Sequence, residues 1–465
     1  MLHRFASRLG MLLVLGASCL GAPQAFARGA PPPPPSANPT LNVERYKLAN
    51  GLEILLHPDR SVPLCVVDVW YHVGSGDEVP GKSGFAHLFE HMMFQGAVHT
   101  GEDAHFDVLK KVGASSINGT TSTDRTNYFE VVPAHQLETA LWLESDRMGF
   151  LLPLLTQKSL DNQREVVRNE RRQNYDNVPY GKERFVLHAL LYGEGHPYRY
   201  MTIGRHEDLE AATLTDVRDF FATWYVPANA TLALAGDFDV AQAKKLIDKW
   251  FGSFPKSQKP TRKTAEPTPV QGPKREEVLD PFARLRMVHY AWHSPKFYAP
   301  GDAELDILAN ALGHTGTGSL YKRLVLETQL AQSVAVYQDS QQLSSVFHIS
   351  AVLKPDADLA QVEKLIEAEV ERVMQEPIAQ RERDRAVTAV EASFVWGLED
   401  LLARAQKLQD YNHYVGHPDA IAEDLGRYRK ATPQGIRDVA ARTLGKDKRV
   451  EVVTLPQPAG ARGAK

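Results

Sequence analysis

Apolar and polar residues alternate along several short stretches of the chain, which is the pattern of strands that bury one face of a sheet. In VERYKLANGLEILLHPD, which begins at residue 43, Asn50-Gly51 separates two such runs and predicts a β-hairpin. The other stretches that predict strands are residues 62–74, 126–132, 231–239 and 284–294. Both halves of the sequence therefore contribute strands.

Between these stretches the apolar residues recur every three to four positions, which indicates amphipathic helices. The predicted helices are residues 84–96, 103–112, 134–148, 157–176, 240–252 and 302–313. The fold class predicted from this mixture of elements is α+β.

One helix–strand segment occurs twice. LEAATLTDVRDFFATWYVPANATLALAG, from Leu209, aligns without gaps with YRKATPQGIRDVAARTLGKDKRVEVVTL, from Tyr428. The identical pairs are Ala212-Thr213 with Ala431-Thr432 and Arg218-Asp219 with Arg437-Asp438. We interpret this as two tandem homologous domains, each a mainly antiparallel sheet packed by helices, with chance similarity as the alternative.

The N-terminus has the composition of a targeting segment. Arg4 and Arg8 precede the apolar run MLLVLGASCLGA, and Ala25-Phe26-Ala27 supplies the small residues of a cleavage site, so residues 1–27 are predicted to be a signal peptide removed before Arg28. The apolar run is shorter than the roughly 20 residues that span a bilayer, so we expect no transmembrane helix in the mature chain. The mature chain is expected to be periplasmic or secreted; the alternatives are a retained anchor and a lipoprotein attached through Cys19.

Composition also divides the rest of the chain. Residues 28–42 contain PPPPP and predict a disordered spacer, and residues 255–274, rich in Pro, Lys and Thr, predict an exposed linker. We therefore expect an N-terminal domain at 43–254, a C-terminal domain at 275–457 and a disordered tail at 458–465. A length of 465 residues with 43% hydrophobic content is sufficient for two cores.

Charge and cysteine content narrow the function further. The formal net charge is −4, which argues against nucleic acid as the main partner. Once the leader is removed, Cys65 is the only cysteine, so no internal disulfide can form and stability must come from the cores.

The helix predicted at 84–96, GFAHLFEHMMFQG, carries three ionisable residues in an apolar run. His87 and His91 lie one turn apart on one face, and Glu90 lies about 60° away, so both imidazoles can meet one ion. A divalent metal would compensate the charge of a buried Glu90. Zinc suits two imidazoles and a carboxylate, with a fourth position for water, and Glu90 could then act as the general base and proton donor. The alternative is a helix whose histidines are only hydrogen-bonded.

His-x-x-Glu-His is the inverted form of the zinc metalloprotease motif. GKSGFAHLFEHMMFQG resembles the M16 peptidase family, the insulinase and pitrilysin group that includes the mitochondrial processing peptidase. The resemblance extends over most of the mature chain, including residues 162–181 and the sequence from His196 onward, and is closest to small bacterial two-domain members. It implies a zinc metalloendopeptidase with a duplicated α+β domain, whose N-terminal copy binds one zinc ion and peptide substrates.

The resemblance also implies the remaining ligand. Glu170 in RNERRQ matches the family's third zinc ligand, and Glu165, about 140° away around the same helix, is its competitor. Gln163 stands where some members have a second glutamate that supports a ligand histidine, so we expect weaker support here. The alternative for Gln163 is a solvent-facing side chain.

SSINGTTSTDRTNYFEVV, residues 115–132, resembles the family's substrate-side edge strand. Asn118, Gly119 and Thr120 would then bind the main chain of an extended peptide that adds to the sheet as a strand. The alternative is an ordinary Asn-Gly turn.

The second half departs from the family. Where the family has an arginine and, seven residues later, a tyrosine that reach the substrate, this chain has Val325 and Gln332; Arg323 and Tyr337 are out of register. Some family enzymes divide the metal and the Arg/Tyr pair between two homologous chains, so the resemblance implies the metal-bearing subunit of a heterodimer. The alternatives are a non-enzymatic assembly or peptide-binding subunit and a hydrolase of non-peptide substrates.

Overall fold

The computed structural model describes residues 38–102, 104–267 and 269–458. The predicted signal peptide, most of the proline-rich spacer and nearly all of the tail lie outside these residues. No helix in the described ranges is long and apolar enough to cross a membrane.

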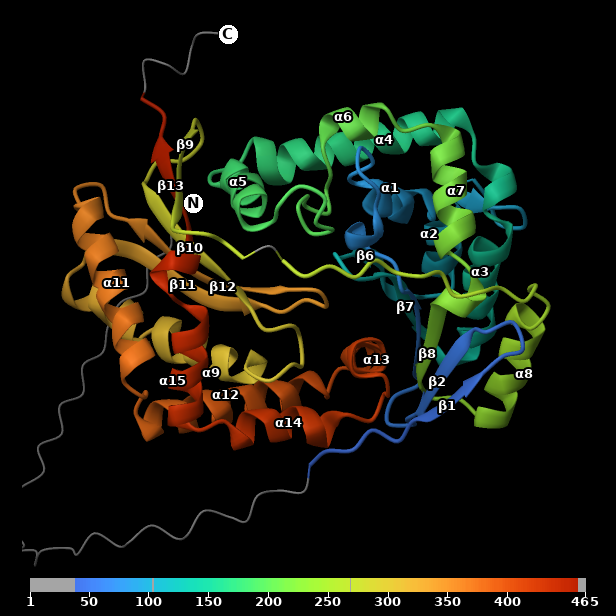
Figure 1. Ribbon diagram of the computed structural model, residues 1–465. Helices are drawn as coiled ribbons and strands as arrows, with labels where there is room; N and C mark the ends of the chain where they lie inside the picture. The colour runs from blue at the N-terminus through green and yellow to red at the C-terminus, as the bar shows by residue number, and fades with distance from the viewer. Residues whose placement is uncertain (1–37, 103, 268, 459–465) are drawn as a thin grey trace, which may run out of the picture. The chain divides into compact units, whose positions relative to one another are not determined.

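The first half of the chain forms a six-stranded sheet in the order β1-β2-β8-β3-β7-β6 (Figure 1). All neighbouring strands are antiparallel except β2 and β8. Its strands are β1 (Glu44–Lys47), β2 (Glu53–Pro58), β3 (Leu64–Tyr71), β6 (Ser115–Thr121), β7 (Thr126–Pro133) and β8 (Ala230–Gly236). The predicted hairpin at Asn50-Gly51 is confirmed, because it joins β1 to β2 with Lys47 opposite Glu53.

The predicted helices of this half are present, two of them with different ends, and the structure adds helices at 181–191 and 206–210 that the sequence pattern did not predict. They are α1 (Phe85–Met92), α2 (Ala104–Lys111), α3 (Leu137–Phe150), α4 (Gln157–Arg171), α5 (Gly181–Leu191), α6 (His206–Glu210), α7 (Leu214–Trp224) and α8 (Val240–Phe251). The helix predicted at 84–96 ends earlier, because Gly96 has a positive φ and begins the two-residue strand β4 (Gly96–Ala97), which pairs with β5 (Gly101–Glu102). The helix predicted at 157–176 ends as a π-helical turn over Arg172–Asp176.

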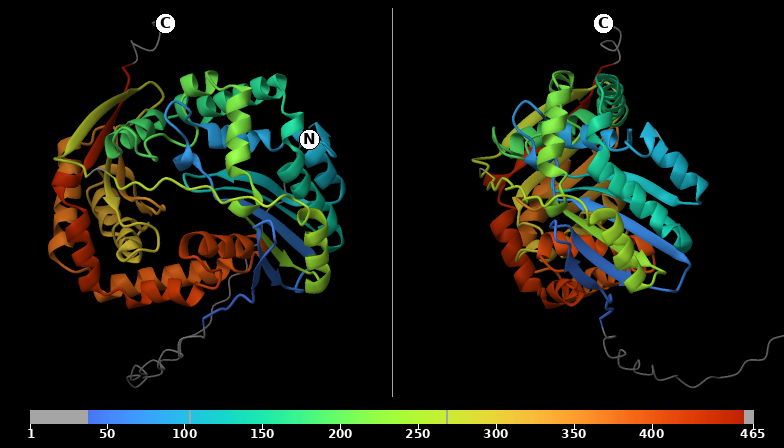
Figure 2. Two further views of the ribbon diagram at one scale, coloured as in Figure 1. Left: turned by 45° about the vertical axis from the view of Figure 1, so that its right-hand side comes forward. Right: turned by 90° about the vertical axis from the view of Figure 1, so that its right-hand side faces the viewer.

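The second half forms a five-stranded sheet in the order β11-β12-β10-β13-β9 (Figures 1 and 2). Its strands are β9 (Lys274–Asp280), β10 (Met287–Ser294), β11 (Ala331–Asp339), β12 (Ser345–Leu353) and β13 (Val450–Pro456). Its helices are α9 (Asp302–Gly313), α10 (Ser319–Tyr321), α11 (Leu359–Gln375), α12 (Gln380–Gly397), α13 (Leu401–Asp410), α14 (Ile421–Lys430) and α15 (Pro433–Thr443).

The tandem repeat is confirmed by this topology. α7 leads into β8 and α15 leads into β13, and each of these strands lies between one antiparallel and one parallel neighbour. The matched threonines also have the same role, because Thr213 caps α7 by accepting the backbone N–H of Asp216 and Thr432 caps α15 by accepting that of Gly435. The fold is therefore α+β, built from two related halves.

Each half contributes one helix that packs on the sheet of the other half. α13 packs on β3 and β8, where Leu401 and Ala405 meet Val66 and Ala235. The Gln409 amide donates hydrogen bonds to two backbone carbonyls of the first sheet. In the same way α5 packs on β10 and β13 of the second sheet. The described residues from Pro39 onward therefore form one compact unit, and the domain boundaries at 254 and 275 stay predictions.

The predicted linker is only partly exposed. Its described residues form neither helix nor strand before β9. However, the Arg262 guanidinium forms an ion pair with the buried Asp77 at 2.8 Å and donates to Gln342 at 2.7 Å. The linker is thus fixed to both halves at this point, because a buried carboxylate requires a partner.

Candidate functional site

The helix that carries the inverted motif has a well-anchored N-terminus. Gly84 precedes α1 with φ of 86°, and its Cα is so close to Gly204 that a side chain would clash. The half-buried carboxylate of Glu78 accepts hydrogen bonds from the backbone N–H groups of Gly84 at 3.0 Å and Ala86 at 2.8 Å. These bonds satisfy donors that a helix start leaves free, so they fix the position of α1.

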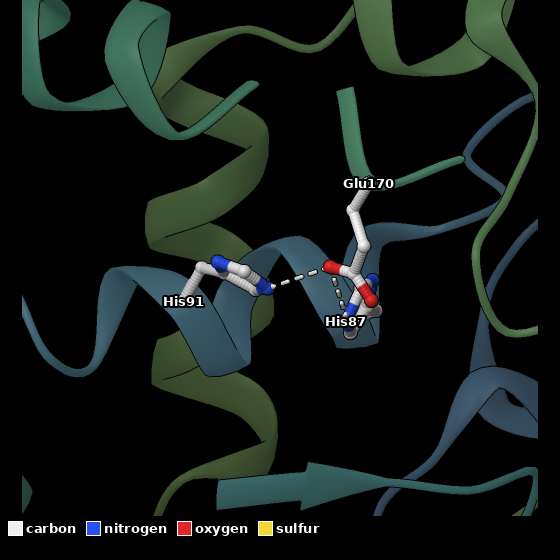
Figure 3. Close-up of side chains that lie close together, drawn as sticks. All are labelled: His87, His91 and Glu170. Carbon is white, nitrogen blue, oxygen red and sulfur yellow. Dashed lines mark ion pairs between the residues drawn. The ribbon is translucent and has the colours of Figure 1, made fainter. Parts of the chain in front are cut away.

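The structure brings His87, His91 and Glu170 together (Figure 3). The histidines project from α1 and the glutamate from α4, and one ligand atom from each lies within 4.8 Å of the others. Glu170 Oε2 is 3.6 Å from His87 Nε2 and 3.4 Å from His91 Nε2. Two imidazole nitrogens and a carboxylate oxygen therefore converge on one point.

These residues fit a zinc ion. Burial lowers the pKa of His87 to about 4, so its imidazole is neutral and can offer a lone pair. The pKa of Glu170 is lowered, first by its hydrogen bond with His91, so the carboxylate is charged. Two imidazoles and one carboxylate are the protein ligands of many zinc hydrolases, with one position left for water or substrate.

Glu90 lies beside this cluster and is only 8% exposed. The Thr121 hydroxyl donates to Glu90 Oε2 at 2.5 Å and so orients the carboxylate. Burial raises the pKa of Glu90, which makes it a stronger base than an exposed glutamate. Glu90 therefore has the position and the electrostatic environment of a general base.

A cavity of about 610 Å³ opens at these four residues. Asn118, Gly119 and Thr120 line it from β6, the last strand of the first sheet. The turn alternative for Asn118-Gly119 is wrong, because Asn118 pairs with Phe129 of β7 within a ladder. A Cβ on Gly119 would lie 3.1 Å from Glu90 Oε1, so glycine allows the strand to approach the base closely.

The three β6 residues differ in what they offer a ligand. Asn118 is exposed, whereas the Thr120 hydroxyl donates to Asn127 Oδ1 at 2.5 Å and is occupied within the sheet. Since β6 ends the strand order, one side of its backbone faces away from β7. Thr120 could therefore contact a ligand through its backbone.

The two other residues of α4 occupy contrasting positions. Gln163 is only 8% exposed, lines the cavity and hydrogen-bonds to His91, so the solvent-facing alternative is wrong. Glu165 points elsewhere and pairs with Arg168 at 2.5 Å. The structure thus places Glu170, and not Glu165, beside the histidines.

The positions that depart from the family lie away from this cavity. Val325 is half-buried against the core of the second half, and Gln332 is exposed on β11. Arg323 pairs with Glu327 at 3.0 Å, and the Tyr337 ring stacks on His348. The residues that line the cavity all belong to the first half.

Sequence reasoning did not single out Glu78 or Thr121. Thr121 lies in the quoted edge-strand segment directly after the three selected residues, so its position on the strand could have suggested it. Glu78 lies seven residues before the first residue of α1 and reaches it through a loop, for which the sequence gives no local signal.

A duplicated α+β fold with a site of two histidines and two glutamates is typical of one class of proteins, the metal-dependent hydrolases. Comparison with known proteins identifies the family. The family model "Insulinase (Peptidase family M16)" matches residues 53–194, and "Peptidase M16 inactive domain" matches residues 211–390. The chain belongs to peptidase family M16.

Similar proteins include peptidases from several bacteria. The zinc protease PqqE of Helicobacter pylori is 31% identical over 377 residues, covering 79% of this chain and 83% of that protein. The uncharacterized zinc protease YmxG of Bacillus subtilis is 22% identical and covers 87% of this chain and 96% of its own length. Relatives named zinc proteases support a peptidase function and a zinc cofactor for the family.

Solved structures agree on the fold. A protease from Helicobacter pylori superposes with a TM-score of 0.83 at 27% identity, covering 90% of this chain and 100% of that one. The periplasmic protease PqqL of Escherichia coli has a TM-score of 0.74 at 15% identity and covers 92% of this chain and 50% of its own.

Proposed function

We propose that the chain is a zinc-dependent endopeptidase that hydrolyses peptides or unfolded polypeptides. One zinc ion would be held by His87, His91 and Glu170, and Glu90 would be the general base. The observation that carries this proposal is the convergence of these ligands on one point, with the buried Glu90 beside it at the same cavity.

The residues of the site have distinct tasks in hydrolysis. Zinc bound there would supply Lewis-acid chemistry, lowering the pKa of a water molecule and polarising the scissile carbonyl. Glu90 takes a proton from the attacking water and delivers it to the leaving amine. Thr121 keeps the Glu90 carboxylate in one orientation during both transfers.

The edge strand supports a peptide substrate. An extended peptide can pair with the outer side of β6 through its backbone, with the exposed Asn118 as an additional main-chain contact. Such pairing requires an extended segment, so folded proteins would be poor substrates.

Replacing Glu170 tests the ligand set. Glu170→Gln in the mature chain, residues 28–465, is expected to lower zinc affinity by more than the 10–100-fold typical of an outer-shell partner, because a charged ligand is lost. Zinc content after dialysis and cleavage of a quenched fluorescent peptide measure the effect. The matched control is Glu165→Gln on the same helix, which should keep full zinc and activity. Equal losses in both variants would overturn this ligand set.

We also propose that the enzyme works as a heterodimer in the cell envelope. The motivation is the replacement of the family's Arg/Tyr pair by Val325 and Gln332, which a homologous partner could supply. We expect weak peptide cleavage by the zinc-loaded chain alone and at least tenfold stimulation by the partner. Equal rates of peptide cleavage with and without the partner would contradict the heterodimer. A separate measurement, the N-terminal residue of the chain isolated from cells, tests export: an N-terminus far from Arg28 would contradict it.

A non-enzymatic assembly or peptide-binding subunit is the second candidate. It is favoured by the same two residues and by the match of the second half to an inactive-domain family model. Zinc-loaded chain that binds peptide but cleaves none, alone or with the partner, would support it.

A further inference from the structure

A second cluster of potential ligands lies buried near the edge strand. His105 of α2, Glu130 of β7 and Glu144 of α3 come from three different elements. His105 is 4% exposed, and both glutamates are 0% exposed. One ligand atom from each lies within 4.8 Å of the others, which is the same limit that the catalytic cluster meets.

Several atoms of this cluster have no partner in the described part of the chain. Both carboxylate oxygens of Glu130 and Nε2 of His105 are buried without a hydrogen bond. Glu144 is different, because both of its oxygens accept hydrogen bonds from the Arg147 guanidinium, one of them at 2.9 Å. Burying an unpaired carboxylate is costly, so Glu130 requires a compensating group.

Arg147 interacts electrostatically with Glu130 as well as with Glu144, but it donates no hydrogen bond to Glu130. A shared proton or a metal ion could complete the compensation. A proton shared between Glu130 and Glu144 would satisfy the carboxylates, but it would leave the His105 nitrogen without a partner. His105 Nε2 is buried without a hydrogen bond, so its lone pair could bind a cation. A divalent cation would satisfy all three residues at once.

The charges nearby are consistent with a cation. Arg147 forms an ion pair with Glu144 and interacts electrostatically with Glu130, so its single positive charge is shared by two glutamates; Asp68 is a further buried carboxyl close to Glu144. Glu144 can bind Arg147 and still coordinate an ion, because a carboxylate has about four lone-pair directions. Tetrahedral ligands about 2.1 Å from zinc lie about 3.4 Å apart, so ligand atoms that lie within 4.8 Å of one another would have to approach by at most about 1.4 Å to bind one ion.

We propose that His105, Glu130 and Glu144 form a second, structural metal site that binds zinc. It would join α2, β7 and α3 behind the edge strand β6, which pairs directly with β7. Phe94 connects it to the catalytic cavity, because its ring packs against His105 at a centroid distance of 5.5 Å and lines that cavity. Since the ligands are buried, the ion would be acquired during folding and would not contact substrate.

Metal stoichiometry tests the proposal independently of activity. The mature chain is unfolded, refolded with excess zinc and desalted, and its zinc content is measured by mass spectrometry. Two ions per chain are expected. A chelator should remove the ion in the open cavity from the folded chain, and the second should be released only when the chain unfolds in guanidinium.

Two variants assign the ions. The double variant His87→Ala/His91→Ala should keep one chelator-resistant zinc, and Glu130→Gln should lose that ion while keeping the catalytic one. If the double variant binds no zinc, or if Glu130→Gln still binds two ions, the proposal is overturned. The double variant leaves the buried cluster intact, so the test remains decisive even if Glu130→Gln does not fold.

Discussion

Glu90→Gln is expected to lower kcat/KM for a fluorescent peptide by roughly 10²–10⁴-fold, the usual contribution of a general base. Glutamine keeps the size of the side chain and can still accept the Thr121 hydroxyl bond that holds Glu90 Oε2. It cannot take a proton from water at neutral pH. The loss should therefore fall on kcat, with KM nearly unchanged.

Zinc binding separates this effect from misfolding. Because Glu90 is not among the converging ligands, the variant should hold as much zinc as the unmodified chain. Glu165→Gln, also a charge-neutralising change but on the outer part of α4, should leave both zinc content and kcat/KM intact. If Glu90→Gln retains more than a tenth of the activity, another group is the base.

The sequence was a good guide to local structure and to the motif. The Asn50-Gly51 hairpin, the long strand β3 and the paired helix caps at Thr213 and Thr432 depend on short segments, so their patterns are readable directly. The spacing of His87 and His91 likewise follows from helix geometry alone. The placement of Glu170 next to them required the family resemblance, because α4 is distant in sequence.

Long-range arrangements could not be predicted in this way. The packing of α13 on the first sheet and of α5 on the second brings together residues more than 100 positions apart, which no local pattern records. The stretch TNYFEVV was correctly predicted to be a strand, but its pattern did not reveal that Glu130 would be buried. Composition predicted an exposed linker at 255–274, but it could not show that Arg262 forms an ion pair with the buried carboxylate of Asp77.

Asp302→Ala is expected to destabilise the chain by about 3–5 kcal/mol, because it removes one partner of a buried ion pair. Asp302 is 0% exposed at the start of α9 and accepts a hydrogen bond from Arg427 of α14 at 2.7 Å. It also accepts the Gln338 amide and the Ser340 hydroxyl at 2.8 and 2.7 Å, which come from the end of β11 and the residue after it. Its loss would leave several partly buried donors without this acceptor.

Urea denaturation of the zinc-loaded chain measures this effect, and the matched control is Glu327→Ala. Glu327 also pairs with an arginine, Arg323, but both side chains are more than half exposed, so its removal should cost no more than about 0.5 kcal/mol. A loss below about 1 kcal/mol for Asp302→Ala would contradict the assigned role. The Asp302–Arg427 ion pair connects α9 to α14 within the second half, and α13, which directly precedes α14, packs on the first sheet. A large decrease in the free energy of unfolding would therefore indicate that this ion pair stabilises the second half and, through α13, also supports the first.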